Sequence, residues 1–136
     1  SLGSRGLGDV YKRQGCLYCQ AHTVLGAERF GCTKKRLEEV WNYANSSAFS
    51  SAEKAALDFA SAAASVPNKV TGKEVSQLKN YWNDNDIVEI MGVIALFGFL
   101  NRWNDSMGSA LEDLPIEKGE EHLMKNTNWT PGKHRV

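Results

Sequence analysis

The chain has 136 residues, which suits one domain, and its composition is that of an ordinary globular protein. Its sixteen basic and sixteen acidic side chains cancel, so it lacks the basic surface that nucleic-acid binding requires, and we expect no nucleic-acid partner. Three cysteines are too few for a disulfide framework and fit a reducing compartment, so we expect a cytoplasmic protein.

The first fourteen residues are rich in glycine, show no hydrophobic periodicity and read SLGSRGLGDVYKRQ. They resemble a translated sequencing-adaptor tail, and such segments are set aside in reasoning about a fold. We therefore expect residues 1–14 to be a non-native or disordered leader, with a genuine flexible leader as the alternative. Residues 15–136 would then form a single helical domain that is incomplete at its N-terminus.

The segment that follows carries the most informative pattern of the chain, GCLYCQAHT at 15–23. We predict a helix over about 17–30 that ends at Gly31. Cys16, Cys19 and His22 are spaced by three residues, so they share one edge of this helix. The amides of a helix start lower the pKa of a thiol, and a histidine one turn away can take its proton. The pattern predicts a reactive dithiol with its own base; the alternative is two inert cysteines in a core.

Other uses of a Cys-x-x-Cys pair fit less well. A structural zinc site usually requires four ligands. The remaining candidate ligands, Cys32, His122 and His134, follow no recognisable spacing. Covalent haem attachment requires a histidine directly after the second cysteine, where this chain has Gln20. A thioredoxin-like site requires a strand before the motif, and no strand is predicted there. We therefore expect no metal and no cofactor. We also expect Cys32 to be a structural thiol and both histidines to lie at the surface.

The rest of the chain divides into helices joined by short connections. Further helices are predicted over about 34–44, 50–64, 71–82, 86–107 and 117–125. Two of them start with a capping box, formed by Ser50 with Glu53 and by Thr71 with Glu74. Gly108 closes the longest helix, and residues 111–115 are predicted to form a turn. No segment alternates apolar and polar residues over the length of a strand, so the fold is predicted to be all-α.

The helix over 86–107 is apolar around nearly its whole circumference, which indicates burial on all sides. Its apolar run, 87–100, is too short to span a bilayer and contains Glu89, so we expect no membrane segment. A short chain can hardly wrap such a helix, so we expect it to contact a second copy of the chain, unless a missing N-terminal region covers it. Residues 101–104 form either its polar end or a group that lines a pocket or fixes the subunit contact.

Four segments together resemble the carboxymuconolactone decarboxylase and alkylhydroperoxidase D-like superfamily. They are GCLYCQAHT at 15–23, SSAEKAAL at 50–57, IALFGFLNR at 94–102 and NWTPGKH at 128–134. The resemblance implies a bundle of about six helices around one long buried helix. It also implies a homo-oligomer, often a trimer or hexamer.

The branch of this superfamily that carries a dithiol reduces hydroperoxides and is recharged by a dithiol or lipoyl-bearing protein. By this resemblance Cys19 matches the thiol that attacks the peroxide, Cys16 the resolving thiol and His22 the relay histidine, which some members place one residue later. The relay glutamate of that branch would fall near Ser4, where no carboxylate stands. The resemblance thus implies a peroxidase whose relay is incomplete in this chain.

Two alternatives stay open. The decarboxylase branch suggests a cofactor-free lyase that acts on a small lactone, although that branch typically lacks the cysteine pair. A redox-sensing module without turnover is the third possibility. The roles of the two thiols could also be exchanged, because Cys16 lies nearer the helix start while Cys19 lies nearer the histidine.

Overall fold

The computed structural model describes residues 15–136, and the predicted leader at 1–14 lies outside them. The described residues form six α-helices and two 3-10 helices with no strand, which confirms the all-α prediction. In chain order the elements are α2 (Leu17–Arg29), α3 (Lys34–Glu39), η1 (Val40–Asn45), α4 (Ser51–Ala63), α5 (Gly72–Lys79), α6 (Asp84–Met107), α7 (Asp113–His122) and η2 (Gly132–His134).

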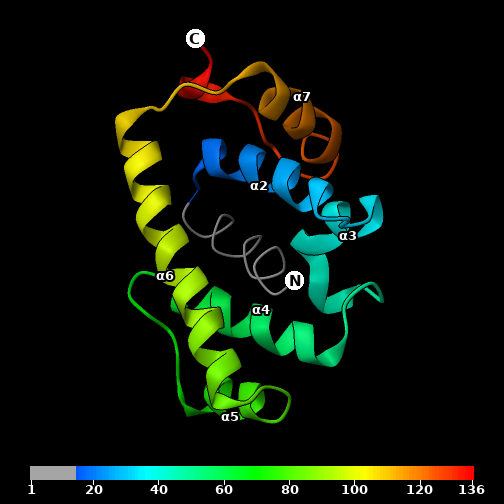
Figure 1. Ribbon diagram of the computed structural model, residues 1–136, viewed down its shortest axis with the longest axis vertical. Helices are drawn as coiled ribbons and strands as arrows, with labels where there is room; N and C mark the ends of the chain where they lie inside the picture. Colours follow the sequence, from blue (N-terminus) through cyan, green and yellow to red (C-terminus); the bar gives the residue numbers. More distant parts are fainter. Residues whose placement is uncertain (1–14) are drawn as a thin grey trace.

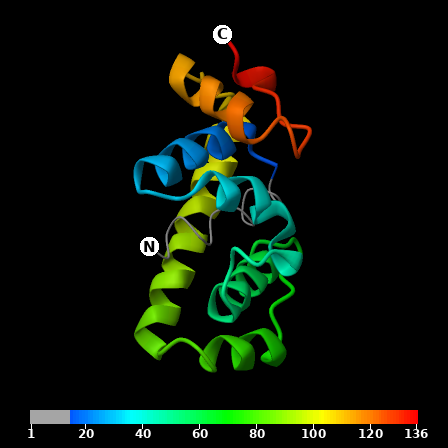
Figure 2. The same cartoon turned by 90° about the vertical axis from the view of Figure 1, so that its right-hand side faces the viewer.

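The long helix α6 runs along the molecule and joins two groups of helices (Figures 1 and 2). At its N-terminal half α4 and α5 pack against it around one hydrophobic cluster that includes Leu78, Ile90 and Ile94. At the other end α2 packs against both α6 and α7. A second cluster there includes Leu123 and Trp129. The candidate dithiol lies in this second half, at the start of α2.

The helix starts that local sequence signals predicted are present. The Ser50 hydroxyl accepts the Glu53 backbone N–H at 3.2 Å, and the Glu53 carboxylate accepts the Ser50 N–H at 2.8 Å. The box of Thr71 with Glu74 is formed in the same way. A third box, with Asn83 as N-cap, starts α6 two residues before the predicted start. Such boxes satisfy amide groups that the first turn of a helix leaves without partners.

Two predicted boundaries are wrong. The helix predicted over 34–44 divides at Val40, because Asn42 has a non-helical backbone with φ −127° and the chain continues as η1. The turn predicted over 111–115 is instead the start of α7, which begins at Asp113 and contains Pro115 in its first turn. Proline is tolerated there because the first amide groups of a helix have no partner within the helix.

In the single chain α6 is buried along one face, so its predicted burial on all sides requires the expected second copy of the chain or a covering N-terminal region. Its buried residues are Ile90, Ile94, Gly98 and Asn101, which follow one face at helical spacing. Large apolar side chains on its other faces are exposed: Val88 71%, Leu96 53%, Phe99 60%, Trp103 58% and Met107 68%. Of the helices described, none is long and apolar enough to cross a membrane.

Candidate active site

The two cysteines of the predicted dithiol meet at the start of α2. Cys16 is the N-cap residue, and its sulfur accepts the backbone N–H of Cys19 at 3.2 Å, as a serine or aspartate oxygen commonly does. The two Sγ atoms are 2.6 Å apart and share a hydrogen bond. Both residues are buried free thiols. A covalent S–S bond of about 2.05 Å therefore needs only a small approach of the two sulfurs.

The hydrogen bond between the sulfurs makes the two thiols unequal. The pKa of Cys16 is lowered, chiefly because the Cys19 thiol donates a hydrogen bond to its thiolate, and burial only partly opposes this effect. The pKa of Cys19 is raised by the same hydrogen bond, then by burial and by the negative charge of the Cys16 thiolate. The first proton of the pair therefore leaves Cys16, and Cys19 holds the second.

His22 lies one helical turn after Cys19, as predicted, but its imidazole is oriented towards another residue. Its Nε2 is 2.9 Å from Oε2 of Glu112, and its ring lies 4.5 Å from the Tyr18 ring, centroid to centroid. Within residues 15–136, no hydrogen bond joins His22 to either sulfur. The register along α2 thus agrees with the prediction, while proton exchange between His22 and the thiols stays a prediction.

Glu112 is a site residue that the sequence reasoning missed. It is the N-cap residue of α7, 90 residues from His22 in the chain, so no local motif reveals it. The carboxylate that the superfamily resemblance placed near Ser4 falls outside the described residues. Glu112 nevertheless gives His22 a carboxylate partner. It also adds, after burial, to the causes that raise the pKa of Tyr18.

The prediction that His134 lies at the surface is wrong. The C-terminal tail folds back over the end of α6, where Leu111 N–H donates to the His134 carbonyl at 2.8 Å, and the side chain is fully buried. Nδ1 of His134 is 2.8 Å from the Ser109 carbonyl oxygen, and Nε2 is 3.6 Å from Oδ1 of Asp105. Tyr18 lies between the two histidines, because its ring centroid is 5.7 Å from that of His134.

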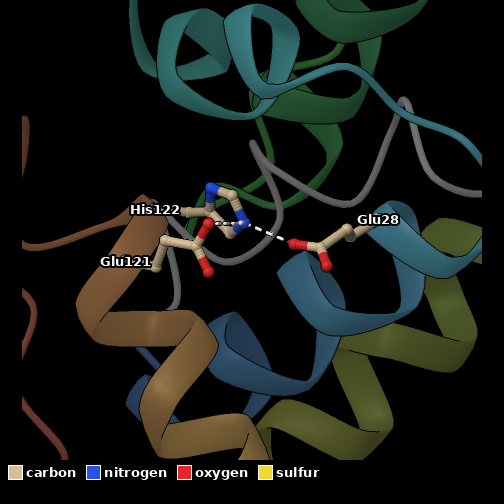
Figure 3. A group of neighbouring side chains, drawn as sticks. All are labelled: Glu28, Glu121 and His122. Carbon is tan, nitrogen blue, oxygen red and sulfur yellow. Dashed lines mark hydrogen bonds and ion pairs between the residues drawn. The ribbon is translucent and has the colours of Figure 1, made fainter.

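The surface prediction is wrong for His122 as well, because α7 turns this face towards α2. Its Nε2 is 2.6 Å from Oε2 of Glu28, and Glu121 completes a group whose ligand atoms lie within 4.8 Å of one another (Figure 3). Lys118 already supplies a cation there, with Nζ 2.8 Å from Glu28 and 3.0 Å from Glu121. The hydrogen bond from Lys118, followed by that from His122, lowers the pKa of Glu28. We therefore read this cluster as an ion-pair network between α2 and α7 rather than as a metal site.

A cleft of about 650 Å³ opens beside the dithiol helix. Its lining includes Gln20 of α2, Trp41 of η1 and Trp129 of the tail. Trp41 also packs against the cluster that contains the two cysteines. This tryptophan therefore contacts both the cleft and the dithiol cluster. Cys32 lies apart from the dithiol, half-buried against the second core cluster, as expected for a structural thiol.

Comparisons with known proteins agree with this fold. Residues 13–62 match the carboxymuconolactone decarboxylase family model. A search of curated proteins finds no significant match. Two crystal structures of the debrominase Bmp8 share the fold with a TM-score of 0.82. One is a cysteine-to-alanine variant in complex with 2,3,4-tribromopyrrole, 29% identical, and the other is the apo protein, 30% identical.

Each comparison covers 88% of this chain and 64% of the Bmp8 chain, so the chain spans less than two thirds of the length of that protein. The matched family segment contains the dithiol and its helix, and the structural match extends over nearly the whole described fold. These findings confirm the resemblance seen in the sequence. The segment that carries the dithiol is thus similar to the carboxymuconolactone decarboxylase family, and the described helices share the fold of Bmp8.

Proposed function

We propose that this protein is a thiol-dependent oxidoreductase that reduces hydroperoxides through a Cys16–Cys19 dithiol–disulfide cycle. The observation that carries the proposal is the pair of free sulfurs 2.6 Å apart at the start of α2. Two inert cysteines in a core would not need different pKa values. Here one thiol has a lowered pKa and the other a raised one, so the site holds a nucleophile beside a second thiol.

The cycle consists of two displacements at sulfur. The Cys16 thiolate attacks the terminal oxygen of the hydroperoxide, the O–O bond breaks, and the alkoxide takes a proton to leave as an alcohol. Cys16 is now a sulfenic acid. The Cys19 sulfur attacks the Cys16 sulfur, hydroxide leaves and takes the Cys19 proton to become water, and a disulfide remains. An external dithiol, such as a lipoyl-bearing protein, restores both thiols by exchange.

This cycle exchanges the roles that the superfamily resemblance implied for the two thiols. The thiolate rather than the thiol is the nucleophile, and the hydrogen bond that Cys19 donates favours the thiolate at Cys16. His22 lies one turn beyond Cys19, so we assign to it the transfer of the Cys19 proton to the hydroxide that leaves during disulfide formation. Glu112 would hold the imidazole in place and stabilise its protonated form.

A second candidate reaction is reductive dehalogenation, which is favoured by the structural match to Bmp8, a debrominase with a 2,3,4-tribromopyrrole complex. The same dithiol would supply two electrons to a brominated aromatic ring. Cys16 would take the bromine, the ring carbon would take a proton, and Cys19 would displace bromide from the Cys16 sulfur. The balance is two thiols and an aryl bromide giving a disulfide, the arene and hydrogen bromide.

The cysteines offer a direct test with a matched control. We expect Cys16→Ser to abolish hydroperoxide consumption driven by dihydrolipoamide without unfolding the chain, because serine is itself a good N-cap residue. Cys19→Ser should form one trappable sulfenic acid at Cys16 and no disulfide. Cys32→Ser, at the third cysteine, should keep full turnover. Bromide release from a bromopyrrole, measured in parallel, tests the second candidate.

The outcomes separate the alternatives. Turnover that persists in both Cys16→Ser and Cys19→Ser would overturn the dithiol cycle, and lactone conversion in the double variant would favour a lyase. Disulfide formation without turnover of either substrate would favour a redox sensor. The thiol roles would be exchanged if the Cys16→Ser variant forms a trappable sulfenic acid at Cys19 and only Cys32→Ser retains turnover. Cys19 would then attack the peroxide and Cys16 would resolve the sulfenic acid.

We also propose that a second copy of the chain covers the exposed apolar face of α6. The support is the exposure of Phe99 and Trp103 at 60% and 58%, together with the oligomers that the superfamily resemblance implies. Sedimentation at micromolar concentration should therefore report an oligomer. Phe99→Glu should dissociate it while leaving the circular dichroism of the helices unchanged. A wild-type chain that sediments as a monomer would refute this contact.

A further inference from the structure

His134 is a buried titratable group that the proposed cycle does not use. Its side chain is completely inaccessible to solvent, although it stands in a polar tail between Lys133 and Arg135. Nδ1 is 2.8 Å from the Ser109 carbonyl oxygen, which can only accept, so Nδ1 carries a proton and donates it. Nε2 has no hydrogen-bond partner.

The unpartnered nitrogen of His134 faces a carboxylate. Oδ1 of Asp105 lies 3.6 Å from Nε2, which is too long for a hydrogen bond but within the range of an ion pair. When Nε2 carries a proton, an imidazolium faces the carboxylate and the two charges cancel. When Nε2 has lost its proton, its lone pair faces a negative oxygen. The charge presented by this pair therefore depends on one proton.

Asp105 lies at the end of α6 that faces the dithiol. Its neighbour Asn104 places the side-chain amide 3.9 Å from the Cys19 sulfur, and the Ser109 hydroxyl donates to Oδ1 of that same amide at 2.8 Å. The hydrogen bond between the thiols has the largest effect on both pKa values, and it lowers that of Cys16 and raises that of Cys19. The negative charge of Asp105 has a smaller effect, which partly opposes the lowering at Cys16 and adds to the raising at Cys19. The carboxylate thus opposes formation of the thiolate.

From this juxtaposition we propose that His134 is the buried counter-ion that controls the effect of Asp105 on the dithiol. The inference rests on the proposed thiol chemistry and extends it. Protonated His134 cancels the field of Asp105 and lets the thiolate form, whereas neutral His134 leaves the carboxylate to oppose it. His134 touches neither sulfur, so it is a positioning residue and not a catalytic one.

The other groups around His134 cannot replace it in this role. The Tyr18 ring of α2 stays neutral, because burial raises its pKa further above its ordinary range. Lys133 lies 3.3 Å from Oδ2 of Asp105, but it is more than half exposed, and lysine is not a residue type that ordinarily changes charge between pH 5 and 8. His22 lies beyond Tyr18 and pairs with Glu112 instead. Among the described groups that surround Asp105, only His134 belongs to a residue type that ordinarily changes charge between pH 5 and 8.

A double-mutant cycle measures this coupling. In a Cys32→Ser background, the alkylation rate of the dithiol by iodoacetamide is followed from pH 5 to 9 by mass spectrometry. Asp105→Asn should raise the rate at pH 6 about three- to tenfold, because the loss of one partly solvated negative charge favours formation of the thiolate. His134→Asn should lower it about threefold, since the asparagine amide can still donate to Ser109 but provides nothing near the position of Nε2. In the double variant the rate should equal that of Asp105→Asn within about twofold.

Two results would overturn the inference. One is an unchanged pH profile in His134→Asn, and the other is an equal change from this substitution whether residue 105 is Asp or Asn, which would indicate a packing effect. If His134→Asn loses near-ultraviolet circular dichroism, His134→Gln replaces it, because the glutamine amide lies near the position of Nε2 without a charge. The rate in His134→Gln should fall below that of wild type at pH 6 and match it at pH 8.

Alkylation needs no hydroperoxide, so this experiment is independent of the proposed activity. If the double-mutant cycle shows the expected coupling but the protein turns over neither hydroperoxide nor bromopyrrole, the proposed function is refuted and the role of His134 is supported. If turnover is normal but the effects of the Asp105 and His134 substitutions simply add, the proposed function is supported and the role of His134 is refuted.

Discussion

The contact between Gly119 and Trp129 offers the sharpest test of how the tail holds the dithiol helix. A Cβ atom at Gly119 would lie 2.4, 2.6 and 2.8 Å from three carbons of the Trp129 ring. The ring is buried, and its Nε1–H donates to the Leu17 carbonyl oxygen at 3.0 Å, one residue after Cys16. The ring therefore cannot move away from a methyl group without weakening its bond to the first turn of α2.

The expected cost of Gly119→Ala follows from three contributions to the free energy of unfolding. Overpacking costs about 1–3 kcal/mol. Loss of the bond to Leu17 costs about 1 kcal/mol, and the better helix propensity of alanine returns about 1 kcal/mol. We therefore expect a net loss of about 1–3 kcal/mol. A chain of this size loses about 4 °C of melting temperature for each kcal/mol.

Gly26→Ala in α2 is the matched control, because it is also a helical glycine and nothing lies within 4 Å of its added Cβ. This variant should gain about 0.5–1 kcal/mol from helix propensity. Urea unfolding followed by circular dichroism should thus separate the two variants by about 2–4 kcal/mol. If Gly119→Ala is as stable as Gly26→Ala, the tail does not hold the ring as the structure indicates, and the reasoning fails.

Two further predictions concern charged groups. Glu53→Gln removes a largely buried ion pair with Arg36 (2.9 Å) and weakens the N-cap of α4, so urea unfolding should show a loss of about 2 kcal/mol; a loss below about 0.5 kcal/mol would contradict this. The folded pKa of Glu28 is lowered by Lys118, so its contribution is present above the ordinary carboxyl pKa of about 4.3 and lost as pH falls through the lowered value. The pKa of Lys118 is raised to about 12, so its contribution is full below about 10.4 and is lost towards pH 12. Glu28→Gln should flatten both limbs of the stability–pH curve, and an unchanged curve would refute the pairing.

Local signals in the sequence predicted most of the helix starts. The box of Ser50 with Glu53 and the glycine at 108, which has φ 60°, act within a few residues of the boundary that they set. The errors arise where local and tertiary preferences differ. Pro115 is compatible with both a turn and a first helical turn, and only the packing of α7 against α2 decides between them. Which face of α6 is buried in the single chain also follows from the helices that pack against it.

The same distinction explains what could be foreseen of the site. Cys16 and Cys19 meet because residues three apart at a helix start face one another, which is a local rule. Glu112, Asp105 and His134 join them through contacts across 25 to 90 residues, for which the chain carries no periodic signal. The charged neighbours of His134 suggested a solvated tail. The structure instead buries the imidazole while Lys133 and Arg135 remain exposed.

The two candidate reactions draw the same two electrons from the dithiol but differ in the proton they need. After cleavage of a peroxide O–O bond, the alkoxide can take its proton from any nearby water. A ring carbon that gives up bromine must be protonated on carbon, which requires an acid held against the ring. His22, with its side chain partly exposed and paired with Glu112 at 2.9 Å, is the described acid best placed at the rim of the site. His22→Gln should therefore reduce bromide release by at least about tenfold more than it reduces hydroperoxide consumption, since general acid catalysis contributes about 10²–10⁴-fold. Equal losses in both assays would show that His22 serves the thiols themselves, as the spacing of the sequence first suggested.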